Sequence, residues 1–180
     1  MRPPIDPETQ VVGAAMSSIV ENIQREDIQP YLDKYNLNTI VPDQWYSAHD
    51  FISILREIGS GDGGMGNLVA IGMAVTHQML VPPELEKVPL SVILMGWNDL
   101  YHLQHRHGNI GGVVTEKISD THYRTIHTHL YPDDMTWGLA YGMAKRWLPA
   151  GTHFKVFYNP QSPRLDDGGG DQTVIDITWN

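Results

Sequence analysis

The sequence of 180 residues contains no cysteine. This absence excludes disulfide bridges, thiolate metal sites, iron–sulfur clusters and thiol nucleophiles, so any metal must be bound by histidine, carboxylate, tyrosine or methionine. Basic residues are also few: 12 Lys and Arg stand against 21 Asp and Glu, which gives a formal net charge of −9. Without a run of positive charge, the chain has no electrostatic basis for binding nucleic acid or an anionic membrane surface.

Long apolar runs are missing as well. No segment approaches the roughly 18 apolar residues of a membrane-spanning helix, and the N-terminal segment lacks the pattern of a signal peptide, so we expect a cytoplasmic protein. An apolar content of 41% suits one globular domain with a real core. We predict a single ligand-binding domain over residues 1–180, with a helical subdomain at 1–108 and a sheet subdomain at 109–180.

The first half of the chain has the apolar spacing of helices. This spacing recurs over four stretches, at residues 9–24, 25–35, 47–58 and 68–80. Ser47 followed by Asp50 marks a helix start, because a serine hydroxyl accepts the backbone N–H three residues on. His77 lies in the last stretch, where it is either a core histidine with one hydrogen bond or a pocket residue.

A further helix begins after Pro89 and carries an apolar stripe that continues to Tyr101. His102 lies off this stripe, over Met95 and Asn98, at ~100° per residue. This mixed face of polarisable and polar groups suits the wall of a pocket.

Two more histidines follow at the end of this helix. We predict that His105 and His107 lie at a frayed, solvated helix end before Gly108. On one regular helix these two side chains project too far from His102 to complete a three-histidine metal site.

The second half alternates between strand and helix patterns. We predict hairpins at 113–119 with 122–130 and at 152–158 with 173–179, and a helix at 132–146 between them. The predicted fold class is therefore α+β, with an N-terminal helical subdomain followed by a C-terminal β-β-α-β-β antiparallel sheet. The loop at 159–171 carries three aspartates, but their spacing matches no calcium loop, and we predict a mobile loop tip.

His127, His129 and Tyr131 share one face of the second predicted strand, because side chains alternate along a strand. Two histidines beside a tyrosine are suited to binding a metal or to meeting the carboxylates of a ligand. A solvated sheet face that carries polar residues is the alternative interpretation.

The segment Asp99-Leu-Tyr-His-Leu-Gln104 resembles the one that carries the axial haem histidine in the haem nitric oxide/oxygen binding (H-NOX) family. The order of helices and the β-β-α-β-β tail are similar to that family and, more distantly, to the vinyl-reductase-type domains of the same superfamily. The resemblance implies haem b as cofactor and His102 as its metal ligand. Together with the faces described above, it gives these candidate cofactor-binding residues: His77, Met95, Asn98, His102, His127, His129 and Tyr131.

The chain departs from the family in the motif that grips the haem propionates, Tyr-x-Ser-x-Arg. Tyr131 matches the tyrosine, but Asp133 and Met135 replace the serine and the arginine. These changes remove a bidentate carboxylate partner and add a negative charge. We expect His127 and His129 to compensate by donating hydrogen bonds to a carboxylate-bearing ligand.

Three functions follow. The first is a haem- or tetrapyrrole-binding sensor of a gas or small molecule, which is not an enzyme and acts on a signalling protein partner. The second is a vinyl-reductase-type receptor for an apolar small molecule, or an interaction module, without haem. The third is a metalloenzyme that uses His127 and His129 with His102, Asp133 or Asp134, although no His-Glu-x-x-His pattern is present.

Overall fold

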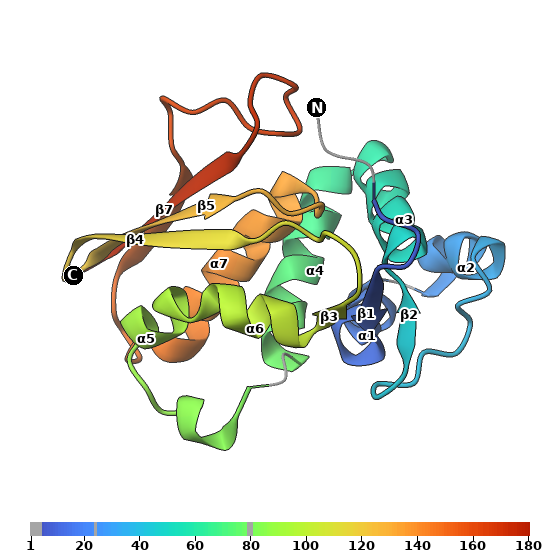
Figure 1. The fold of residues 1–180 in the computed structure, drawn as a ribbon, viewed down its shortest axis with the longest axis horizontal. Coiled ribbons are helices and arrows are strands. Elements are labelled where there is room, and N and C mark those ends of the chain that lie inside the picture. The colour runs from blue at the N-terminus through green and yellow to red at the C-terminus, as the bar shows by residue number, and fades with distance from the viewer. Residues whose placement is uncertain (1–4, 24, 79–80) are drawn as a thin grey trace.

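The protein, described by a computed structural model at residues 5–23, 25–78 and 81–180, is built on a four-stranded antiparallel sheet. The strand order is β4-β5-β7-β6. The bounds are β4 (Val113–Ser119), β5 (His122–His127), β6 (Phe154–Tyr158) and β7 (Thr173–Trp179). Helices lie on one face of this sheet (Figure 1). The predicted α+β class and the β-β-α-β-β order of the second half are confirmed.

Helix α7 (Asp133–Trp147) connects the two hairpins and packs against α4 (Gly64–Gln78). Acidic residues lie in the first turn of α7 and basic residues in its last turn, which complements the helix dipole. Glycines let the two backbones approach closely. A Cβ atom at Gly138 would clash with the carbonyl oxygen of Val69, and one at Gly72 with that of Met135.

The helical half contains α1 (Gly13–Asn22), α2 (Arg25–Lys34) and α3 (Ala48–Ser60), and a 3-10 turn, η1 (Pro83–Leu85), follows α4. The predicted start of α3 is confirmed, because the Ser47 hydroxyl accepts the Asp50 N–H at 3.2 Å. Residues 24 and 79–80, at the ends of two predicted helices, lie outside the described residues.

Two predictions about this half are wrong. Residues 10–12 form a strand, β1 (Gln10–Val12), rather than the start of a helix. This strand lies between β2 (Trp45–Ser47) and β3 (His105–Arg106) in a small antiparallel sheet of order β2-β1-β3. The two β-branched residues Val11 and Val12 pair with partners distant in sequence, which a local helical pattern cannot reveal.

The predicted helix after Pro89 is divided in two, α5 (Leu90–Met95) and α6 (Trp97–Leu103). Gly96 separates them with φ −90° and ψ 6°, outside helical values. Glycine is a poor helix former, which is consistent with a break at this position. The predicted division into subdomains at residue 108 stays a prediction. Just before residue 108, β3 follows the end of α6 and pairs with β1.

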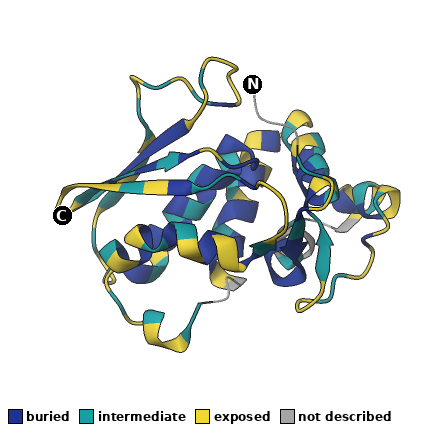
Figure 2. Ribbon diagram, in the orientation of Figure 1, coloured by how far each residue is buried: buried dark blue, intermediate teal, exposed yellow. Residues whose placement is uncertain are grey.

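Buried residues concentrate where the helices meet the inner face of the sheet (Figure 2). On that face Tyr123, Thr125, Ile175 and Ile177 are all buried. Among the described residues, no helix is both long and apolar enough to cross a membrane.

Candidate functional site: a buried cluster of rings

Six rings meet where α6, the end of β5 and the start of α7 converge. We call them the ring cluster: Trp97, Tyr101, His105, His127, His129 and Tyr131. The centroids of Tyr101 and His105 are 4.3 Å apart, and those of Trp97 and His127 are 4.9 Å apart. His129 lies between the two pairs, 5.0 Å from His127 and 5.5 Å from Tyr101. The contacts therefore run continuously from α6 to the sheet.

The alternation of β5 directs part of this cluster inward. Thr125 and His127 point to the core, whereas Arg124 is only partly buried on the opposite face. The strand ends at His127, and the next residues carry His129 and Tyr131 toward α7. His127 and His129 are 0% and 3% exposed, so the solvated sheet face considered as an alternative does not form.

A first set of hydrogen bonds joins the two halves of the chain through His105. Its Nδ1 lies 2.7 Å from the backbone oxygen of Tyr101, and its Nε2 lies 2.5 Å from the hydroxyl of Tyr131. A carbonyl oxygen can only accept, so Nδ1 carries the proton and the tautomer of a neutral His105 is fixed. Nε2 is then an acceptor, and the Tyr131 hydroxyl donates to it.

A second set runs from His129 into the sheet. The Thr125 hydroxyl donates to the Ile175 carbonyl oxygen at 3.3 Å, so it accepts from Nε2 of His127 at 2.8 Å. Since the proton of neutral His127 is on Nε2, its Nδ1 is an acceptor. Nε2 of His129, 3.2 Å away, is the donor to this atom. Buried polar groups need such partners, because an unpaired donor or acceptor is costly away from water.

Removal from water shifts the titration of the cluster. Burial raises the pKa of Tyr101 and of Tyr131 well above the usual range. Burial also lowers the pKa of His105 to about 4; the hydrogen bond to Tyr101 opposes this shift and the nearby His102 adds to it. Near neutral pH, Tyr101, His105 and Tyr131 are consequently uncharged.

These residues enclose a cavity of about 40 Å³ between the helices and the sheet. It is lined by Ala15, Val75, Trp97, Tyr101, Gln104, His105, His129, Tyr131, Met135 and Leu139. One water molecule needs ~10–15 Å³ of space measured in this way, so the cavity suits a small molecule of a few non-hydrogen atoms. Its wall is mostly apolar with a few polar groups, which is typical of a ligand-binding site.

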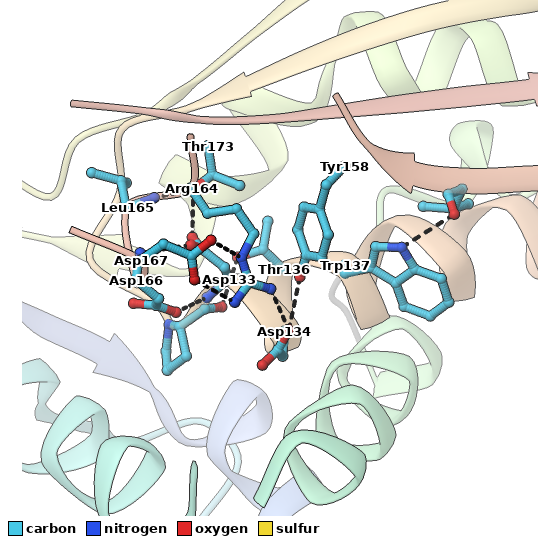
Figure 3. Close-up of polar contacts among 12 residues, drawn as sticks. Asp133, Asp134, Thr136, Trp137, Tyr158, Arg164, Leu165, Asp166, Asp167 and Thr173 are labelled. Carbon is cyan, nitrogen blue, oxygen red and sulfur yellow. Dashed lines mark hydrogen bonds and ion pairs between the residues drawn. The ribbon is translucent and has the colours of Figure 1, made fainter. Parts of the chain in front are cut away.

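The acidic residues that follow Tyr131 do not line this cavity, and they bond to the loop after β6 instead (Figure 3). Asp133 accepts hydrogen bonds from the Asp166 backbone N–H at 2.8 Å and from the Thr173 hydroxyl at 2.6 Å. The Asp166 carboxylate in turn accepts the Asp133 backbone N–H at 2.6 Å. This reciprocal pair fixes the loop at residues 159–172 to the start of α7.

A second carboxylate strengthens the same attachment. Asp134 accepts hydrogen bonds from the Tyr158 hydroxyl and from Arg164, each at 3.0 Å, and the Arg164 guanidinium also stacks on the Tyr158 ring (Figure 3). The prediction of a mobile loop tip is therefore wrong for this part of the loop. Contacts spanning about 30 residues hold it, and the local sequence does not reveal them.

The predicted site residues are only partly brought together. His129 and Tyr131 line the cavity, and His127 lies directly behind His129. Met95 is 57% exposed, His77 and His102 are also exposed, and none of the three lines the cavity. Asn98 is partly buried and accepts the Val113 N–H at 3.1 Å, which links α6 to β4.

The cavity is also lined by residues that were not predicted from the sequence, among them His105, Tyr101, Gln104 and Met135. The prediction of a solvated His105 is wrong, because its ring is partly buried and bonded at both nitrogens. One signal was present: His105 follows Tyr101 by four residues, so the two share a helix face. Only Tyr131, 26 residues further on, makes that face an interior one.

Among the described residues, no group of three or more His, Asp or Glu side chains is arranged to hold a metal ion. In particular, Asp133 and Asp134 bond to the loop rather than joining His127 and His129. The arrangement expected for the metalloenzyme is not present in this part of the chain.

Comparison with solved structures identifies the architecture. An H-NOX protein from S. oneidensis in the Fe(II)NO state matches with a TM-score of 0.69 at 13% identity, over 94% of this chain and 99% of that one. An oxygen-binding H-NOX domain related to soluble guanylate cyclases matches with a TM-score of 0.67 at 11% identity, over 93% and 92% of the two chains. The chain has the H-NOX fold. No protein-family model matches the sequence, and neither does any curated protein sequence.

The cavity of this H-NOX fold does not fit haem. Pockets for drug-sized ligands measure ~300–1,000 Å³, and haem needs no less, whereas this cavity measures about 40 Å³. At the positions that resemble the propionate motif, Tyr131 is bonded to His105, Asp133 is bonded to the loop, and Met135 lines the cavity wall. Within the described part of the chain, no arginine lines the cavity to pair with a propionate.

Proposed function

We propose that this protein is a small-molecule receptor that uses the H-NOX fold without haem. The observation that carries the proposal is the enclosed cavity of about 40 Å³ beside the ring cluster. A sensor needs a ligand site where two parts of the molecule meet, because the ligand must favour one arrangement of those parts over another. This cavity lies between α1, α4, α6 and α7 and the segment after β5.

The ring cluster couples this site to both halves of the chain. His105 lies at the junction of α6 and β3, and its hydrogen bond to Tyr131 reaches the segment that leads into α7. A ligand that contacts Tyr131 acts on this bond directly. We propose that occupancy of the cavity shifts the helical part relative to the sheet, and that a signalling partner detects this shift. The proposal involves no catalytic step.

Haem binding is the second candidate, and the similarity to haem-containing H-NOX structures is the observation that favours it. In that case α4 and α7 would have to separate from α6 to admit the macrocycle, and His102 would have to turn inward as the axial ligand. The hydrogen bond from Tyr131, just before α7, to His105, just after α6, opposes such an opening. The haem-free receptor is therefore the function that the geometry supports best.

A visible absorption spectrum after haem addition and desalting separates the two candidates. For the haem-free receptor we expect no stoichiometric Soret band, in the wild type or in His102→Ala. A stoichiometric band that weakens or shifts in His102→Ala, but not in the matched exposed-histidine variant His77→Ala, would overturn the proposal and establish a haem sensor. The three spectra can be interpreted without knowing which gas binds.

A further inference from the structure

The hydrogen-bonding groups on the cavity wall constrain what it can hold. The tautomer of neutral His105 is fixed by the Tyr101 carbonyl, so Tyr131 donates its only proton to Nε2 of His105 at 2.5 Å. The Tyr131 oxygen keeps its lone pairs, and it belongs to a residue of the cavity wall. Toward a ligand, Tyr131 is therefore an acceptor.

Neighbouring tyrosine and histidine side chains also use their protons in hydrogen bonds within the protein. Tyr101 donates its proton to the Ile110 carbonyl oxygen at 2.8 Å. Both nitrogens of His105 are already engaged. Gln104 is 5% exposed and donates one N–H of Nε2 to the Leu100 carbonyl oxygen at 3.5 Å; this bond leaves the amide oxygen as an acceptor and the second N–H as a donor. The hydroxyl and imidazole protons of these lining residues are thus used within the protein.

Charge is disfavoured in this cavity. Among the residues that the structure describes, no lysine, arginine, aspartate or glutamate lines it, and an ion moved there from water would lose its hydration without gaining a counter-ion. An anion would also face the lone pairs of Tyr131. The carboxylate-bearing ligand expected from the sequence is therefore contradicted by the polarity of the wall, and the diatomic gases NO and O₂ offer no proton for an acceptor.

We propose that the cavity binds a small uncharged hydrogen-bond donor of about two to four non-hydrogen atoms, such as a simple amide or alcohol, whose N–H or O–H donates to the Tyr131 oxygen. This assignment rests on the proposed receptor function and names its ligand class. The remaining wall, formed by Ala15, Val75, Met135 and Leu139, receives the apolar part of the ligand.

Formamide and formate are a matched pair of probes, because each has three non-hydrogen atoms and only formamide is uncharged with N–H donors. We expect formamide to perturb Trp97 fluorescence, with a dissociation constant on the order of 1 mM or weaker, given the limit for so few atoms. Formate at the same concentration and ionic strength should have no effect. A long-range ¹H–¹⁵N spectrum should show His105 protonated at Nδ1.

Two variants locate the contact. Tyr131→Phe removes the acceptor oxygen and should weaken formamide binding about 3- to 10-fold, as expected for one neutral hydrogen bond. Tyr123→Phe, another buried tyrosine that stacks on Trp179 outside the cavity, should leave binding unchanged. Leu139→Phe fills the cavity and should abolish binding of formamide and of xenon, even if Tyr131→Phe does not fold.

The possible failures are distinguishable. Binding of formate as tight as that of formamide, or formamide binding unchanged in Tyr131→Phe, would overturn the donor assignment while leaving the receptor function in place. If neither formamide, formate nor xenon under pressure perturbs Trp97 or His105, the cavity takes no ligand, and both proposals fail.

Discussion

The two faces of β5 satisfy buried polar groups in opposite ways. On the inner face, His127 lies among aromatic rings and exchanges hydrogen bonds with uncharged partners. On the outer face, His122 and Arg124 hold the carboxylate of Asp176, whose side chain is only 2% exposed. His122 Nε2 lies 2.7 Å from Oδ1, and Asn159 donates to Oδ2 at 2.9 Å.

The two faces differ in whether the buried titratable group has a partner that stabilises its charged form. Burial acts to raise the pKa of Asp176, but the hydrogen bonds from His122, Asn159 and Arg124 outweigh it, so the pKa lies below its ordinary value. His105, on the inner side, has no carboxylate partner, and burial lowers its pKa to about 4. The outer network is therefore stable when charged, and the inner one when neutral.

Lowering the pH should give the largest difference in stability between the inner and the outer network. Unfolded His105 takes up a proton near pH 6.5, whereas the folded residue does so only near pH 4, so the unfolded state binds more protons between these values. Stability should fall as the pH drops through this range, by ~3 kcal/mol at most for this residue, because one pKa unit corresponds to ~1.4 kcal/mol.

Urea unfolding at a series of pH values measures this loss. His105→Leu should reduce the slope of stability against pH by about one proton in that range, and the exposed control His153→Leu should leave it intact. An identical slope in His105→Leu would show that His105 is not held neutral. Asp176 should contribute no loss above pH 4, because its folded pKa lies below the ordinary 3.8.

Asp176→Asn tests the outer face. The three partners of Asp176 all donate, so the amide group of asparagine would direct N–H groups at donors and lose the ionised acceptor. We expect a loss of ~2 kcal/mol at pH 7, less than for a fully buried pair because His122 and Arg124 are about 30% exposed and can regain water. Asp171→Asn, in the exposed loop, is the control for thermal unfolding. An equal loss of stability in Asp176→Asn and Asp171→Asn would mean that the outer network does not stabilise the fold.

Tyr131→Phe should have the smallest effect on stability. It removes one neutral hydrogen bond while keeping the ring, and such bonds contribute ~1 kcal/mol. The variant should also leave His105 Nε2 without its donor, which a change in the ¹⁵N shift of that nitrogen would report. If stability fell by as much as in Asp176→Asn, the inner face would depend on its hydrogen bonds as strongly as the outer face does.

Much of the fold was predictable because it is encoded locally. The Ser47 cap, the charge distribution of α7 and the alternating strands on either side of α7 each depend on residues a few positions apart. The break at Gly96 was missed, since the apolar stripe continues through it. The strand β1 was missed because its partners lie about 35 and 95 residues away.

The candidate site was predicted only in part. His127, His129 and Tyr131 do lie together, as predicted, but only His127 belongs to β5; the strand ends there, and the segment that follows it places His129 and Tyr131. The sequence did not indicate His105, whose partner Tyr131 belongs to another part of the fold. It also left open where Asp133 points, which the contacts with Asp166 and Thr173 decide.

The sequence by itself determined most of the helical segments, the β-β-α-β-β order of the second half and the absence of thiol chemistry, since periodicity, caps and composition act over short distances. Only the tertiary structure decided which histidines are buried, that the cavity measures about 40 Å³, and that the Tyr131 hydroxyl donates its proton to His105. These properties depend on which side chains from distant segments fill the same space and compete for the same protons, and no local pattern specifies that competition.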